Sequence, residues 1–413
     1  MLPSWWPRRR PKHRSLSRFQ SGRPRRGASK VHLEALEPRY LLSADLNPMV
    51  VDMVDFDGDD FTLSYDGTQY LQVIDDNTGL VVDQKLLQET SEIQIRGSES
   101  DETLTVDLAN FVLPMDISFA GGGGNDQLSV INGSFDSATH TATAFGAGSL
   151  GLFDGVENEL ISFTGVESID DQTLANERAF ENATGAGQVI RVTDDATPDD
   201  DFIAIDSGGT DAFSAIRLQS PTSMLRISAG DGGDTIDLDD PGAVAAAVLD
   251  IQGGLGIDTL NGLEQDNVWN IGGLDSGSVE GVAFSGVENL VGGSFDDTFI
   301  VEAGGSVSGQ VTGGAGSDRL AGKDTGSTFS LTGAGSGDID GTSFTGIEVL
   351  AGGAGSDMLA GNAAGSTFSL TGAGTGDADG TSFTGIETVA GGAGTDTLAG
   401  KDTGSTFSLT GAG

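Results

Sequence analysis

Residues 313–351 read GGAGSDRLAGKDTGSTFSLTGAGSGDIDGTSFTGIEVLA, and residues 352–390 read GGAGSDMLAGNAAGSTFSLTGAGTGDADGTSFTGIETVA. A third copy opens at Gly391, and the chain stops partway through it at Gly413, so we expect a truncated C-terminus. Openings at Gly313, Gly352 and Gly391 define a 39-residue repeat. Fixed periods of about 20–50 residues are typical of stacked architectures, in which each unit buries its core only against its neighbours.

Two further units precede these copies. A diverged 39-residue copy opens at Gly253 and ends before Gly292, and the stretch from Gly292 to Gly313 is about half as long. Units of these two lengths suggest one turn and two turns of the same coil. The spacing therefore predicts coils of about 20 residues.

Short apolar segments separated by Gly-rich turns decide the fold class. Phe329-Ser330-Leu331 and the stretch from Phe344 alternate apolar with small polar residues, as half-buried strands do. We therefore predict an all-β chain, a parallel β-solenoid of the β-helix or β-roll kind. The same stacking predicts two ladders in register, listed as Phe329, Phe368 and Phe407, and Phe284, Phe344 and Phe383. Recurrence at fixed spacing argues against a disordered low-complexity chain.

Composition excludes several classes of protein. The 413 residues include 65 Gly, no Cys and three His, which rules out disulfide scaffolds, Cys-ligated zinc and thiol catalysis. With only 10 Pro and no strict Gly-X-Y triplet repeat, collagen is excluded as well. The longest apolar run, Val244 to Leu249, is far short of the roughly 18 residues of a membrane span. We expect no membrane span.

Charge is segregated along the chain. Residues 1–39 hold 11 of the 20 Lys and Arg against two acids, whereas the remainder carries 60 of the 62 Asp and Glu. A body this acidic repels nucleic acid and attracts divalent cations. We therefore expect no nucleic-acid partner.

Next to the basic tail lies a distinctive string, LEALEPRYLLSA, at Leu33–Ala44. It resembles the LEPR-XLL segment of large, repetitive exported bacterial proteins, and it is similar to the planctomycete extracellular N-terminal segment. The resemblance implies export and an extracellular or outer-surface location. The alternative is the start of an amphipathic helix that Pro38 interrupts, which explains the apolar spacing but not the string.

Five segments follow from these shifts in composition. We expect a disordered basic tail at 1–30, a sorting segment at 31–46 and capping strands at 47–96, with a hairpin turning at Asp66-Gly67. Residues 97–252 are expected to form an irregular solenoid, and 253–413 the 39-residue repeat solenoid.

Each repeat opens with a recurring nonapeptide, called the motif below. Gly313–Ala321 fits G-G-x-G-x-D-x-U-x, as do residues 121–129, 253–261, 352–360 and 391–399. This pattern resembles the calcium-binding repeats of RTX (haemolysin-type) proteins. Glycines allow positive φ and turn carbonyls inward, and the Asp adds a carboxylate, so the resemblance implies bound Ca²⁺.

The candidate calcium ligands are seven aspartates with the motif glycines: Asp126, Asp258, Asp318, Asp338, Asp357, Asp377 and Asp396, and Gly313, Gly314, Gly316, Gly352, Gly353, Gly355, Gly391, Gly392 and Gly394. From Asp318 to Asp396 the five acids recur at a nearly even spacing, close to one predicted coil. Coils of that length would stack them about 4.8 Å apart on one edge, where a cation relieves their repulsion. We therefore expect calcium to promote folding. Solvated, metal-free turns are the alternative.

The sequence offers few residues of the kinds that an enzyme active site would need. Past residue 45 only nine Lys and Arg are scattered over the chain, and Trp269 is the one Trp beyond the tail. We expect no catalytic residues and no enzyme in this segment. The predicted function is a secreted or cell-surface repetitive structural or adhesin-type protein, stabilised by calcium, with extracellular matrix or cell-surface glycans as further partners. The alternative is a non-catalytic fragment of a larger exported carbohydrate-active β-helix enzyme.

Overall fold

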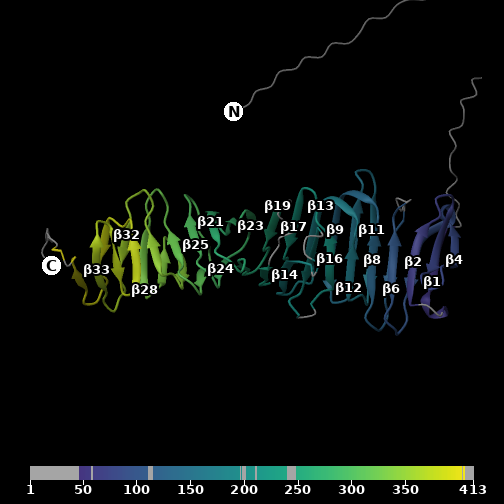
Figure 1. Cartoon of the computed structure of the whole chain (residues 1–413), viewed down its shortest axis with the longest axis horizontal. Coiled ribbons are helices and arrows are strands. Elements are labelled where there is room, and N and C mark those ends of the chain that lie inside the picture. Colours follow the sequence, from purple (N-terminus) through teal and green to yellow (C-terminus); the bar gives the residue numbers. More distant parts are fainter. Residues whose placement is uncertain are drawn as a thin grey trace, which may run out of the picture. The chain divides into compact units, whose positions relative to one another are not determined.

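The computed structural model describes residues 46–56, 59–109, 115–195, 197, 201–209, 212–239, 248–401 and 403–404. These residues form 37 strands and two 3-10 turns, η1 (Met53–Asp55) and η2 (Leu87–Glu89), with no α-helix among them. In that part of the chain, accordingly, no helix has the length and apolar character of a membrane span. Figure 1 shows the strands following one another in chain order, from β1 in purple to β33 in yellow. The predicted all-β solenoid is confirmed.

Nineteen strands form one sheet, called sheet A. In the order of their pairing they are β1 (Asn47–Asp52), β5 (Thr90–Arg96), β7 (Ile117–Ala120), β11 (Asn158–Thr164), β10 (Ala147–Phe153), β9 (Ser134–Ala144), β13 (Leu174–Asn182), β17 (Met224–Ser228), β19 (Val248–Gln252), β23 (Val282–Ser285), β22 (Ser276–Val279), β21 (Val268–Gly273), β25 (Thr298–Val301), β27 (Arg319–Ala321), β31 (Val349–Ala351), β35 (Thr381–Thr384), β34 (Thr375–Ala378), β33 (Thr367–Gly372) and β37 (Thr397–Ala399).

The other eighteen strands form sheet B. In the order of their pairing they are β4 (Leu80–Leu86), β3 (Tyr70–Asp75), β2 (Asp60–Tyr65), β6 (Thr103–Asp107), β8 (Gln127–Ile131), β12 (Ser168–Asp171), β16 (Ala215–Gln219), β15 (Phe202–Asp206), β14 (Val189–Asp194), β18 (Thr235–Asp239), β20 (Thr259–Asn261), β24 (Asn289–Gly293), β26 (Gln310–Gly314), β30 (Thr342–Thr345), β29 (Ser336–Ile339), β28 (Thr328–Gly333), β32 (Met358–Ala360) and β36 (Thr388–Ala390). Because β4 and β36 each pair with a single strand, these pairings make an open row of strands and not a closed barrel.

Simple coils visit each sheet once. In them the chain runs along one strand of sheet A, turns, and runs along one strand of sheet B, so that neighbouring coils pair in parallel. Leu290 thus lies beside Val311, and Ile236 lies beside Leu260. Both spacings are close to the predicted coil of about 20 residues.

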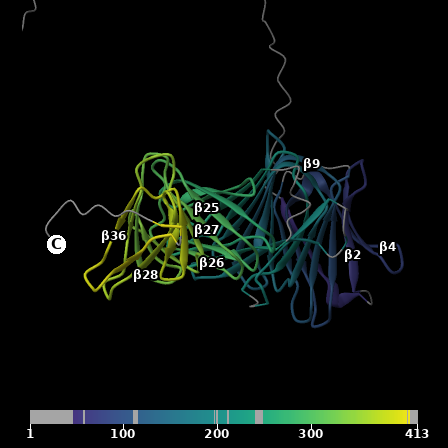
Figure 2. The same ribbon diagram turned by 60° about the vertical axis from the view of Figure 1, so that its left-hand side comes forward.

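Other coils are lengthened by three-stranded antiparallel meanders that stay within one sheet. There are six in the described residues: β2–β4, β9–β11, β14–β16, β21–β23, β28–β30 and β33–β35. Figure 2 shows the region of β25, β26, β27 and β28, which belong alternately to sheet A and sheet B. A meander adds two strands to its sheet without adding a crossing to the other sheet.

The expectation that one 39-residue repeat makes two coils is wrong. Residues 313–351 visit sheet A with β27, sheet B with the meander β28–β30, and sheet A again with β31. Residues 352–390 make the same three visits with the sheets exchanged. A 39-residue repeat is therefore one and a half coils and not two. Its register partners, Leu320 with Leu350 and Val311 with Phe344, are accordingly closer in sequence than one full repeat.

The predicted phenylalanine ladders are wrong for the same reason. Phe329 lies in sheet B and pairs with Leu359, whereas Phe368 lies in sheet A and pairs with Leu398. Phe344 and Phe383 are likewise in opposite sheets, so neither set stacks in register. Phe407 lies outside the described residues. The described members are nonetheless core residues, because each of them is buried.

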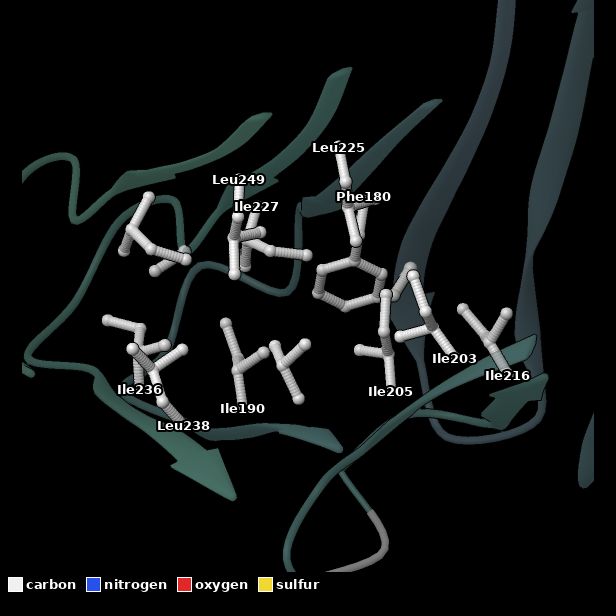
Figure 3. Packing of buried hydrophobic residues seen from close by; sticks show 14 of the residues in the cluster. Phe180, Ile190, Ile203, Ile205, Ile216, Leu225, Ile227, Ile236, Leu238 and Leu249 are labelled. Carbon is white, nitrogen blue, oxygen red and sulfur yellow. The ribbon is translucent and has the colours of Figure 1, made fainter. Parts of the chain in front are cut away.

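Between the two sheets runs a single apolar core. Figure 3 shows Phe180, Leu225, Ile227 and Leu249 of sheet A facing Ile190, Ile203, Ile205, Ile216, Ile236 and Leu238 of sheet B. Burying one such side chain contributes about 1.5–3 kcal/mol. Trp269 also belongs to this core, since it is fully buried and stacks on Phe299 with ring centroids 5.5 Å apart.

At the N-terminal end, the hairpin predicted at Asp66-Gly67 is confirmed. Strands β2 and β3 pair antiparallel, and Asp66 Oδ1 accepts hydrogen bonds from the backbone N–H groups of Thr68, Gln69 and Tyr70. Strands β1 and β4 end the two sheets, where capping strands were expected. The predicted tail (1–30) and the sorting segment up to residue 45 lie outside the described residues.

Candidate functional site

The motif turns lie at two edges of the solenoid. We call the turns that lead from sheet B to sheet A the first edge, and the turns that lead from sheet A to sheet B the second edge. Asp318 and Asp396 lie on the first edge, before β27 and β37, whereas Asp357 lies on the second edge, before β32. Asp126 and Asp258 also lie on the second edge. The expectation that Asp318, Asp357 and Asp396 share one edge is wrong, because each 39-residue repeat ends half a coil out of phase.

Two other predicted ligands lie in strands and not in the motif turns. Asp338 belongs to β29 and Asp377 to β34, the central strands of their meanders. Their Oδ1 atoms accept hydrogen bonds from the backbone N–H groups of Gly341 at 2.8 Å and Gly380 at 3.0 Å, which tightens the next hairpin. The five evenly spaced aspartates therefore do not form one stack.

Motif glycines are required for two different reasons. Gly314 and Gly316 adopt φ values of +113° and +138°, the left-handed conformations expected for turning carbonyls. Gly353 and Gly355 do not, but a Cβ on either would lie 2.2–2.3 Å from backbone atoms of the adjacent coil. Gly392 and Gly394 are as tightly packed, against Asn362 and Gly365. These four positions therefore need glycine because adjacent coils approach too closely to leave room for a Cβ.

Asp at motif position 6 joins neighbouring coils. The side chain of Asp318 is fully buried, and its Oδ1 accepts a hydrogen bond from the backbone N–H of Asp297, at 2.8 Å, in the coil before. The N–H of Asp318 in turn donates to Glu348 Oε2, at 2.8 Å, in the coil after. One residue is thus both donor and acceptor between three successive turns.

We call this arrangement the turn ladder. Its described contacts, each from a backbone N–H to the carboxylate of the next coil, are Glu102 to Asp126, Asp126 to Glu167, Gln188 to Asp234, Asp234 to Asp258, Asp258 to Glu288, Asn267 to Asp297, Asp297 to Asp318, Asp318 to Glu348, Ser327 to Asp357, Asp357 to Glu387 and Ser366 to Asp396. Hydrogen bonds to charged acceptors contribute about 1.5–3 kcal/mol each.

Sequence reasoning missed the four glutamates whose carboxylates are acceptors in this ladder. Each follows a Phe-Ser/Thr-Gly-Val/Ile string, and they are Glu167, Glu288, Glu348 and Glu387. The last three follow their motif aspartates, Asp258, Asp318 and Asp357, at one constant spacing. That recurrence was visible in the sequence, and it could have shown that every such turn pairs with a motif turn.

In six aspartates of the turn ladder, the second carboxylate oxygen has no hydrogen-bond partner. Oδ2 is buried without a hydrogen bond in Asp126, Asp234, Asp258, Asp297, Asp318 and Asp357. Burial raises the pKa of Asp126 and of Asp234 to about 6. The pKa values of Asp258, Asp297 and Asp318 are raised for the same cause.

A calcium shell needs six to eight oxygens at about 2.3–2.6 Å. Each buried motif Asp offers one oxygen without a hydrogen bond, because Oδ1 already accepts a backbone N–H. Within the described ranges, no three acidic or histidine side chains converge on a point that could hold a metal ion. The ladder carboxylates therefore do not form a calcium shell by themselves, and calcium binding stays a prediction.

One other polar cluster is buried, between β9, β12 and β13. Asp171 Oδ2 accepts hydrogen bonds from Arg178 and, at 3.0 Å, from His140, while Thr173 Oγ1 donates to Oδ1 at 2.6 Å. All four side chains are at most 2% exposed. Burial would raise the pKa of Asp171, but the charge of Arg178 and the hydrogen bond from His140 outweigh it and hold that pKa well below its usual range. The cluster is closed to solvent, so it joins sheets and offers no substrate a surface.

No protein-family model and no curated protein matches this sequence.

Proposed function

We propose that this chain is a repeat-built structural segment of an exported protein displayed on the cell surface or secreted, with an adhesin-type or matrix role. The observation that carries the proposal is the continuous stack of coils, in which the turn ladder and the apolar core link each coil only to its neighbours. Such an array can be lengthened by adding repeats without redesigning the core. Eighteen strands spaced by about 4.8 Å extend a sheet by about 80 Å, which suits a spacer.

Charge and the N-terminal string support export. The acidic body does not favour nucleic acid or anionic lipid, and the string at Leu33–Ala44 resembles segments of exported proteins. Glycans of the matrix or of neighbouring cells are the partners that this role implies. Calcium is not needed for the proposal, because the turn ladder joins coils through its own hydrogen bonds.

The alternative, a fragment of a carbohydrate-active β-helix enzyme, has less support. Carbohydrate clefts usually present aromatic side chains, and Trp269 is buried in the core and unable to do so. The motif acids Asp126, Asp258, Asp318 and Asp357 are also buried, with Oδ1 occupied by a backbone N–H.

Surface display can be tested in the organism that makes the protein. Antibodies raised against the purified full chain should label intact cells or precipitate the protein from culture medium, and protease added to intact cells should remove that label. A reporter fused behind residues 1–46 should be exported, whereas the same fusion with Leu41 and Leu42 replaced by Asp should remain inside. Labelling only after cell lysis would contradict the proposal.

A further inference from the structure

One coil of the ladder carries Asn in place of Asp at motif position 6. Residues 262–270 align with the motif, with Gly262 at position 1, Asn267 at position 6 and Trp269 at position 8. The side chain of Asn267 is 1% exposed, and its Nδ2 donates to the carbonyl of Gly292, at 3.1 Å, in the next coil. Asn267 thus offers a hydrogen-bond donor to that coil.

An Asp at motif position 6 places a hydrogen-bond acceptor where Asn267 places a donor. In each turn this place can be located from the point that a Cβ on the glycine at motif position 1 would occupy. At Gly313 it lies 1.9 Å from the carbonyl oxygen of Gly346 and 2.5 Å from Asp318 Oδ2. At Gly262 it lies 2.9 Å from the carbonyl oxygen of Gly292 and 3.0 Å from Asn267 Nδ2. The carbonyl of the next coil therefore faces a carboxylate oxygen at Asp318 and an amide nitrogen at Asn267.

The same juxtaposition recurs in four other turns. The pairs of next-coil carbonyl and carboxylate are Gly165 with Asp126, Gly286 with Asp258, Gly313 with Asp297, and Gly385 with Asp357. In each, both oxygens lie too close for a Cβ on the first glycine, and Oδ2 has no hydrogen bond. Two acceptors that face each other leave a buried polar group unsatisfied, at a cost of about 1–3 kcal/mol.

We propose that the motif turns of this chain lock coils together without a metal ion, and that a hydrogen-bond donor at position 6, which Asn has and Asp lacks, satisfies the carbonyl of the next coil better than the Asp of the motif. Asn267 Oδ1 is itself buried without a hydrogen bond. At Asp318, where Oδ1 accepts the N–H of Asp297, an Asn side chain would keep that acceptor and convert the unpaired oxygen into a donor. The motif thereby acts as a metal-independent interlock between neighbouring coils, in contrast to the calcium role that its resemblance implies.

The test uses the full chain and three variants, with thermal unfolding followed by circular dichroism in EDTA and in millimolar CaCl₂. Asp318→Asn should raise Tm by about 2 °C, a small shift because the gain of one hydrogen bond is spread over the large unfolding entropy of a chain of this size. Asp318→Ala should lower Tm, because it leaves the N–H of Asp297 buried without an acceptor. Asp338→Asn removes the same charge from the same repeat outside the ladder, and it serves as the matched control.

Wild-type protein should melt at the same temperature in EDTA and in calcium, whether or not the Ala variant folds. Calorimetric titration of the folded wild-type chain with CaCl₂ should show no heat of binding that Asp318→Asn removes. A calcium-dependent rise in Tm that is lost in Asp318→Asn would overturn the proposal. So would an Asn variant that is as unstable as the Ala variant, because the amide would then not match the site.

Discussion

Residues 46–252 and residues 253–404 build the same pair of sheets and share the turn ladder, but the first region also links its strands through Arg–Asp pairs on the sheet faces. The first region has six Lys and Arg, and the second has three. In the first region, Arg side chains on the outer sheet faces bridge neighbouring strands to Asp, as Arg217 does to Asp170 at 3.0 Å and Arg226 to Asp250 at 3.0 Å. In the second, the turn ladder is denser: seven of its eleven described contacts lie there, against three within the first region.

The difference follows coil length. Register partners in the first region can be as distant in sequence as Ile169 and Ile216, whereas the described partners of the second region are no farther apart than Val311 and Phe344. The ladder contacts described above stop at Glu167 and resume at Gln188, and the buried cluster of Asp171 and Arg178 lies between these two positions. Where neighbouring turns differ in length and do not stack, the buried cluster and the Arg–Asp pairs on the sheet faces link the coils in place of the turns.

The largest effect should come from removing the carboxylate of the buried cluster. Asp171→Asn leaves the Arg178 charge buried without a counter-charge, and we expect a loss of about 3–5 kcal/mol of unfolding free energy. Urea denaturation of the full chain measures it, with Asp239→Asn, an exposed partner of Arg191, as the control. If both variants lose less than about 1 kcal/mol, the cluster does not hold the first region together.

The next effect tests the ladder through its glycines. Gly313→Ala places a Cβ 1.9 Å from the carbonyl oxygen of Gly346, so the coils must separate, and we expect a loss of about 1–3 kcal/mol. Gly333→Ala is the matched control in the same repeat, because nothing lies within 4 Å of its Cβ. Equal urea midpoints for the two variants would show that the turns are not tightly packed.

Acid should then stabilise the protein. The folded pKa values of Asp126 and Asp234 are raised to about 6, so their stabilising contribution is complete below about pH 4 and is lost as pH rises through 6. We expect Tm to rise by a few degrees between pH 7.5 and pH 5. Asp171 does not oppose this, because its lowered pKa costs stability only at lower pH. The double variant Asp126→Asn, Asp234→Asn should lose most of the rise, and an unchanged pH profile would contradict the prediction.

The smallest effect belongs to the outer ion pairs. Arg226→Gln removes a partly exposed pair with Asp250, and we expect a loss below about 1 kcal/mol that salt largely masks. Urea denaturation at low and high ionic strength measures it. A loss comparable to that of Asp171→Asn would mean that surface pairs, and not the core cluster, hold the first region.

The sequence by itself was enough to predict the all-β solenoid, the hairpin at Asp66-Gly67 and the burial of the repeated phenylalanines. These features rest on alternation of apolar residues and on turn residues, which act over a few neighbours along the chain. Motif positions 1, 2 and 4 were also recognisable, because only glycine tolerates the backbone or the close approach found at Gly313, Gly314 and Gly316.

Only the tertiary structure decided which edge each motif occupies and what its aspartate does. A short strand with alternating residues can either pair with the strand before it or cross to the opposite sheet, and its own pattern is the same in both cases. Each repeat has five strands, three of which stay in one sheet, so the chain makes three crossings from one motif to the next, and this odd number sends Asp318 and Asp357 to opposite edges. Whether the Asp is solvated, bound to metal or buried depends in turn on the neighbouring coil, since the N–H of Asp297 and the carbonyl of Gly346 reach Asp318 only after the coils have stacked.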